Sequence, residues 1–154
     1  MISIINGNLL DATENIIGHQ VNCKGVMASG VAKGISEKYP VVYGHYKERC
    51  FHHRNDPVKM LGDCMIIKVG KGKYVANLFG QHGYGREKGV IYTDYDALRK
   101  SIQALKDNAK YHKLSIALPY GIGCGLGGGD WGNILYPMLE DIFSDYELTL
   151  YKLN

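Results

Sequence analysis

Two spacings of apolar residues alternate along the chain, and together they predict interleaved strands and helices. Short, mostly apolar runs typical of strands cover residues 1–6, 16–22, 64–69, 73–79, 114–119 and 146–153. Apolar residues recur at helical spacing within residues 31–39, 40–50, 93–109 and 131–142. The two middle strands are adjacent in sequence and form a predicted hairpin around residues 70–72. The pattern therefore predicts an α/β fold, a three-layer α/β/α sandwich with a mixed central sheet.

Polar residues next to these helical patterns predict where the helices begin. Ser29 and Thr93 carry hydroxyl oxygens that can accept a first-turn N–H, so we expect each to be an N-cap. Pro40 opens the second helix, at the position where its missing N–H costs nothing. Asp130 precedes the last helix and is either its N-cap or a participant in chemistry.

A run of glycines separates the strand predicted at 114–119 from the helix predicted at 131–142. Residues 120–132 contain seven glycines, far more than a turn requires. Glycine permits positive φ and lets backbone N–H groups approach a ligand without an intervening Cβ. A strand, a glycine loop and a helix N-terminus together form an anion site, most often for phosphate; a merely flexible loop is the alternative. Two other loops, at 23–30 and 80–91, also follow strands, so we expect the ligand between the three.

Composition narrows the kind of ligand and partner. The 154 residues carry a net charge of +3 with no run of Lys or Arg, which favours an anionic small molecule over a nucleic-acid surface. The chain length predicts a single domain over residues 1–154. Four scattered cysteines form no C-x-x-C pair, and no apolar run is long enough to cross a membrane, so we expect a cytoplasmic protein with reduced thiols. The neighbours His52 and His53 lie in a polar loop where we expect them to be solvated, so no metal site is predicted.

Two common phosphate-binding motifs fit poorly. Residues 123–128 match G-x-G-x-x-G, but too little chain follows for the βαβ unit that a dinucleotide-binding site needs. No Gly-Lys-Ser/Thr follows the glycines, which excludes a P-loop.

Three pieces of the sequence, taken together, resemble the macrodomain family, which binds ADP-ribose. They are Ile-Asn-Gly-Asn-Leu-Leu at 5–10, His-Gln-Val-Asn-Cys-Lys-Gly-Val-Met-Ala-Ser-Gly-Val-Ala at 19–32, and Leu-Pro-Tyr-Gly-Ile-Gly-Cys-Gly-Leu-Gly-Gly-Gly-Asp-Trp at 118–131. The chain looks most similar to the branch of ADP-ribose-1''-phosphate phosphatases, terminal ADP-ribose glycohydrolases and DNA-ADP-ribose antitoxins. The sandwich fold that this resemblance implies agrees with the apolar pattern.

The resemblance also implies which residues contact the ligand. Asn8, with Leu9 beside it, occupies the place where the family often has an aspartate that accepts from the adenine amino group; capping of a turn is the alternative for Asn8. Asn22 and the loop after it are implied to surround the distal ribose and diphosphate, while satisfying a strand end is the alternative for Asn22. The remaining implied ligand contacts are Lys24, Ser29, Gly30, Val31, Gly121, Ile122, Gly123, Cys124, Gly125 and Leu126.

Three residues are candidates for catalysis: His19, Gln81 and Asp130. The phosphatase branch has a histidine at the position of His19, whose ordinary pKa suits an acid, a base or a phosphate ligand; a core histidine is the alternative. Glycohydrolases of the family pair a lysine with an aspartate, and these positions correspond to Gln81 and Gly127 here. Glutamine has no basic amine, so deglycosylation that depends on the lysine is in doubt.

The sequence therefore predicts a monomeric macrodomain that binds ADP-ribose without cofactor or metal. Dephosphorylation of ADP-ribose-1''-phosphate is the leading reaction. The alternatives are an ADP-ribosyl hydrolase acting on protein or nucleic acid, and a non-catalytic reader of ADP-ribose or a related nucleotide.

Overall fold

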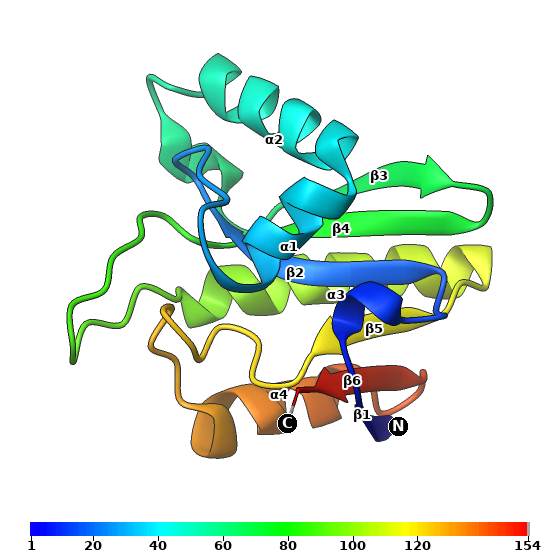
Figure 1. Cartoon of the computed structure of the whole chain (residues 1–154). Coiled ribbons are helices and arrows are strands. Elements are labelled where there is room, and N and C mark those ends of the chain that lie inside the picture. The colour runs from blue at the N-terminus through cyan, green and yellow to red at the C-terminus, as the bar shows by residue number, and fades with distance from the viewer. Residues whose placement is uncertain (154) are drawn as a thin grey trace.

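Six strands form one sheet in the order β1-β6-β5-β2-β4-β3 in the computed structural model, which describes residues 1–153 (Figure 1). The neighbouring pairs are parallel except β3 and β4, which are antiparallel, so the prediction of a mixed sheet with a hairpin is confirmed. The strands are β1 (Ile2–Asn6), β2 (Ile16–Asn22), β3 (Cys64–Gly70), β4 (Lys73–Gln81), β5 (Ile116–Pro119) and β6 (Leu148–Lys152).

Two pairs of helices cover the two faces of the sheet. The helices α1 (Gly30–Lys38) and α2 (Pro40–His52) pack on one face, and α3 (Tyr95–His112) and α4 (Tyr136–Ile142) pack on the other. Short 3-10 helices at Leu9–Asp11 and Pro57–Met60, and a π-helix at Trp131–Leu135, complete the chain. This arrangement is the predicted three-layer sandwich.

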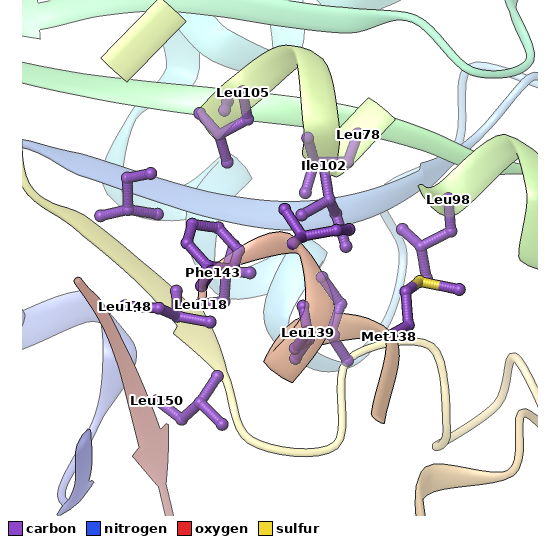
Figure 2. Packing of buried hydrophobic residues seen from close by; sticks show 14 of the residues in the cluster. Leu78, Leu98, Ile102, Leu105, Leu118, Met138, Leu139, Phe143, Leu148 and Leu150 are labelled. Atoms are coloured by element: carbon purple, nitrogen blue, oxygen red, sulfur yellow. The ribbon is translucent and has the colours of Figure 1, made fainter. Parts of the chain in front are cut away.

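Alternate residues of β2 enter two separate cores. Ile17 and Val21 pack against α1 and α2, whereas Ile16 packs against α3 and α4. Because both faces of the central strand are covered, the strand has the nearly continuous apolar sequence that parallel sheets require. Figure 2 shows side chains from α3, α4 and the sheet gathered around Phe143, whose ring is fully buried.

The first turns of three helices differ in detail from the prediction. Asp94, not Thr93, caps α3, because its carboxylate accepts the N–H of Ala97 at 3.0 Å and leaves the Thr93 hydroxyl free for another partner. Ser29 lies at the N-cap position of α1 but makes no side-chain capping bond there. The last helix begins as a π-turn, since the N–H of Leu135 donates to the carbonyl of Asp130, five residues earlier.

The loops that follow β2, β4 and β5 gather at one end of the sheet, on the left in Figure 1. These strands are parallel neighbours, so their carboxyl ends share that edge. None of the helices in residues 1–153 is both long and apolar enough to span a bilayer.

Replacing Phe143 by alanine should lower the free energy of unfolding by about 3–5 kcal/mol, because it opens a cavity between α4 and the sheet. Urea denaturation measures this loss. Phe51 on α2 is 60% exposed, so Phe51→Ala is the matched control and should change the free energy by no more than about 0.5 kcal/mol. Equal losses in the two variants would contradict the packing described here.

Candidate functional site

A cleft of ≈ 950 Å³ opens where the three loops meet. Its walls come from the end of β2 with the loop and helix start that follow, from the end of β4 with its loop, and from the glycine loop after β5. Most of the predicted site residues lie in these walls. They are His19, Asn22, Ser29, Gly30, Val31, Gln81, Gly121, Ile122, Gly123, Cys124, Gly125 and Leu126.

Four predicted site residues lie outside the walls of the cleft. The Asn8 side chain accepts the N–H of Leu10 at 2.9 Å and so caps a turn, which was the alternative for this residue. Leu9 is buried in the core beneath α1 and α2, and Lys24 is exposed on the loop after β2. Asp130 accepts the N–H of Asn133 at 3.1 Å, which makes it the N-cap of the last helix.

The glycines of the loop after β5 serve three different purposes. Gly121 and Gly123 have φ values of +80° and +78°, which residues with a side chain rarely adopt. A Cβ on Gly125 would meet no atom within 4 Å, so this part of the backbone is open. A Cβ on Gly127 would lie 2.5 Å from the Thr93 hydroxyl and 2.7 Å from the Gly123 carbonyl oxygen. Position 127 therefore has no room for the carboxylate that the resemblance to glycohydrolases implies at this place.

A chain of hydrogen bonds joins the glycine loop to β2 and β4. Gln20 Nε2 donates to Gln81 Oε1 at 2.6 Å and to Thr93 Oγ1 at 2.9 Å. Thr93 Oγ1 in turn donates to the carbonyl of Gly123 at 2.8 Å. The backbone N–H groups of Tyr92 and Thr93 both donate to the carbonyl of Gly127. These bonds fix the loop after β4 and the glycine loop relative to each other.

Asn22 shapes the loop after β2. Its Oδ1 accepts the N–H of Lys24 at 2.9 Å and lies 2.8 Å from the hydroxyl of Tyr46, while its Nδ2 donates to the carbonyl of Val26. Burial raises the pKa of Tyr46, which keeps that hydroxyl protonated. The Asn22 side chain therefore pairs with backbone groups that follow the end of β2, which was the alternative given for this residue. Asn22 also lines the cleft.

His19 lies in the wall of the cleft but is almost entirely buried. Its Nε2 lies 2.6 Å from Asn77 Oδ1, so the ring proton is assigned to Nε2, and the buried Nδ1 has no hydrogen-bond partner within residues 1–153. Burial lowers the pKa of His19 to about 4, although the bond to Asn77 opposes this shift. The ring is neutral near pH 7, which weighs against the predicted role as an acid. The core-histidine alternative is supported, with a side chain in place of the expected backbone partner.

The cleft offers neither a thiolate nor a metal site. Burial and the nearby carboxylate of Asp130 raise the pKa of the Cys124 thiol to about 11, so the sulfur is protonated near pH 7. Across residues 1–153 there is no group of three or more His, Cys, Asp or Glu side chains that could hold a metal ion.

The sequence analysis missed four polar residues that line the cleft: Gln20, Tyr84, Arg86 and Tyr120. Gln20 follows His19 along β2 and points to the opposite face of the sheet. The sequence pattern does not show which of the two faces meets a loop. Tyr84 and Arg86 lie in the glycine-bearing loop at 80–91, whose position after a strand was the available signal.

Comparison with known proteins identifies one matching family and several similar proteins. The model of the Macro domain family matches residues 19–135. An ADP-ribose 1''-phosphate phosphatase from Debaryomyces hansenii is 30% identical over 132 residues, which are 73% of this chain and 74% of the relative. A DNA ADP-ribosyl glycohydrolase from Mycobacterium tuberculosis is 26% identical over 87% of this chain and 36% of its own length. A Bacteroides thetaiotaomicron protein of unknown function superimposes with a TM-score of 0.85 at 26% identity, covering 99% of this chain and 98% of the other.

Acid should destabilise the protein through His19. Well above pH 6.5 this histidine is neutral in both the folded and the unfolded chain, so the stability is fully present. As pH falls from 6.5 towards 4 the unfolded chain binds a proton that the folded chain excludes. The free energy of unfolding should then fall by about 1.4 kcal/mol per pH unit more steeply than in His19→Gln.

Urea denaturation of both proteins at pH 7 and pH 5 measures this difference. NMR of the histidine rings provides a second readout should His19→Gln fail to fold. A ring of His19 that titrates near pH 6.5 in the folded protein would contradict the account of its burial.

Proposed function

Because the chain belongs to the Macro domain family, we propose that its cleft binds ADP-ribose and removes the phosphate from ADP-ribose-1''-phosphate. The observation that carries this proposal is the open backbone at Gly121 and Gly125, which lines the same cleft as the amino end of α1. The sequence similarity to the Debaryomyces hansenii phosphatase selects the reaction.

The diphosphate of the ligand lies between these two walls. Backbone N–H groups at Gly30 and Val31 begin a helix, where partial positive charge favours anions. No residue in the walls carries a carboxylate that would repel a phosphate. The volume of ≈ 950 Å³ is at the upper end for small-molecule sites and suits a diphosphate with a nucleoside on one side and a second ribose on the other.

In the reaction, water attacks the phosphorus of the 1''-phosphate. The bond between phosphorus and the ribose 1''-oxygen breaks, inorganic phosphate leaves, and the ribose oxygen takes up a proton to give ADP-ribose. Backbone N–H groups stabilise the charge that develops on the phosphate oxygens. His19 is neutral and buried, with Nε2 bonded to Asn77, so it supports the wall of the cleft from beneath, which replaces the acid role predicted from sequence.

Gln81 acts as a positioning residue in this proposal. Its Oε1 accepts from Gln20 and its Nε2 donates to the carbonyl of Gly83 at 2.7 Å, so both ends of the amide are already engaged. It supports the wall against which the distal ribose lies. The exposed residues Asn8 and Lys24 contact ligand parts that extend beyond the cleft in this proposal. Leu9 is buried in the core and has no such role, and Asp130 caps the helix after the glycine loop.

Hydrolysis of an ADP-ribosyl linkage is the second candidate, favoured by the similarity to the glycohydrolase over 87% of this chain. Two features weigh against it, the missing amine at Gln81 and the lack of space at Gly127. A non-catalytic reader is the third candidate, since binding and turnover would use the same walls.

We also propose that residues 1–154 act as one monomeric domain in the cytoplasm. The four cysteines are free thiols in the structure, as a reducing compartment allows. Burial raises the pKa of both Cys23 and Cys64 to about 12, which keeps these two sulfurs protonated and unreactive.

A panel of three substrates separates the candidates. The purified protein should release inorganic phosphate from ADP-ribose-1''-phosphate, and should release no ADP-ribose from ADP-ribosylated protein or ADP-ribosylated DNA. Release of ADP-ribose from either macromolecule without release of phosphate would favour the second candidate. Binding of ADP-ribose in a calorimeter without turnover of any substrate would establish the reader.

Replacing Gly125 by glutamate should lower the affinity for ADP-ribose by about 100-fold or more, since a like charge facing the diphosphate costs several kcal/mol. The position has ordinary φ and open space, so the fold should persist. Gly44 on α2 is likewise exposed with no atom near its Cβ position, and Gly44→Glu is the matched control that should bind as the wild type does. Isothermal titration calorimetry measures both; unchanged affinity in Gly125→Glu would place the ligand elsewhere.

A further inference from the structure

The walls of the cleft carry one formal charge near pH 7. Arg86 is the single Lys or Arg among the lining residues, no Asp or Glu joins it there, and His19 is neutral. Arg86 is exposed, and within the described part of the chain its guanidinium takes part in no ion pair or hydrogen bond, even though Glu87 follows it directly. An unpaired guanidinium at the wall of a cleft without carboxylates attracts an anionic group.

The loop that carries Arg86 is fastened at both ends. The N–H of Cys23 donates to the carbonyl of His82 at 3.0 Å, which ties the start of the loop to the end of β2. Near its other end, the N–H of Tyr92 donates to the carbonyl of Gly127 at 2.8 Å. Gly85 packs so closely on the Tyr92 ring that a Cβ there would overlap it. These contacts fix the backbone of the loop, so Arg86 stays beside the cleft and little backbone entropy is lost when a ligand binds there.

The position of Arg86 in the walls indicates which part of the ligand it meets. The other two walls supply backbone N–H groups, which suffice for the diphosphate. The third wall, formed by Gln81 and its loop, is left for the reacting end of the ligand. A guanidinium pairs with a phosphate monoester through two parallel hydrogen bonds, a geometry that the single hydroxyl of an unphosphorylated ribose does not match.

We propose that Arg86 binds the terminal phosphate on the distal ribose and makes the protein prefer ADP-ribose-1''-phosphate to ADP-ribose. This inference rests on the proposed function and adds a specificity residue to it. Hydrolysis removes the group that Arg86 holds, so the product loses this contact and dissociates more readily than the substrate.

Rapid-mixing fluorescence tests the proposal before turnover. Trp131 is the one tryptophan of the chain, and its ring packs 4.8 Å from that of Tyr120 in the wall of the cleft, so its emission reports binding. Arg86→Gln should weaken binding of ADP-ribose-1''-phosphate by about 10–100-fold, the range for losing charge-assisted hydrogen bonds. It should change the affinity for ADP-ribose by less than about twofold, and Arg86→Lys should fall between.

Lys88→Gln is the matched control, because Lys88 belongs to the same loop, carries the same charge and does not line the cleft. It should leave both affinities unchanged. ADP-ribose bearing its extra phosphate on the adenosine ribose is the control ligand and should be insensitive to Arg86→Gln.

Two results would overturn the assignment while leaving ADP-ribose binding intact. Equal weakening of ADP-ribose and ADP-ribose-1''-phosphate would place Arg86 on the diphosphate, and no change for either ligand would remove it from the site. Failure of the wild type to bind ADP-ribose at all would refute the proposed function and this inference with it.

Discussion

The hydrogen bond from the Thr93 hydroxyl to the carbonyl of Gly123 is the contact on which the shape of the cleft depends. Glycine-rich backbone loses much conformational entropy when it becomes ordered. Without a tether, a loop of this composition would therefore have a large free-energy cost for adopting a single conformation. Thr93 also receives a hydrogen bond from Gln20 of β2, so the loop is held from a central strand of the sheet. The backbone on the open side of the loop is consequently free to meet a ligand without further ordering.

The same tether explains why glycines of one loop are not equivalent. Gly127 is pressed against Thr93 and the backbone of Gly123, so its role is close packing, whereas Gly125 faces open space. Close packing on one side and an open backbone on the other give a wall made of peptide groups. With one guanidinium, a neutral histidine and no carboxylate in the walls, such a cleft favours phosphate groups and provides no strong base.

The apolar pattern was sufficient to predict the sheet, its hairpin and the three loops at one edge, because each depends on local periodicity and on the shared direction of parallel strands. It was insufficient where two neighbouring residues compete for one role. Thr93 and Asp94 can each cap a helix, and only the position of Gly123, thirty residues away, decides that the hydroxyl turns to the loop. The pKa of His19 likewise depends on burial and on Asn77 of β4, which no local pattern reveals.

Mapping the ligand on the backbone tests the central claim most directly. In a ¹⁵N-labelled sample titrated with ADP-ribose, the amide signals of Gly123, Gly125 and Leu126 should move together with that of Gly30, because their N–H groups face one diphosphate. The signal of Ile4, on the exposed edge strand β1, should stay in place. Shifts that avoid the glycine loop, or no shifts at all, would contradict the account.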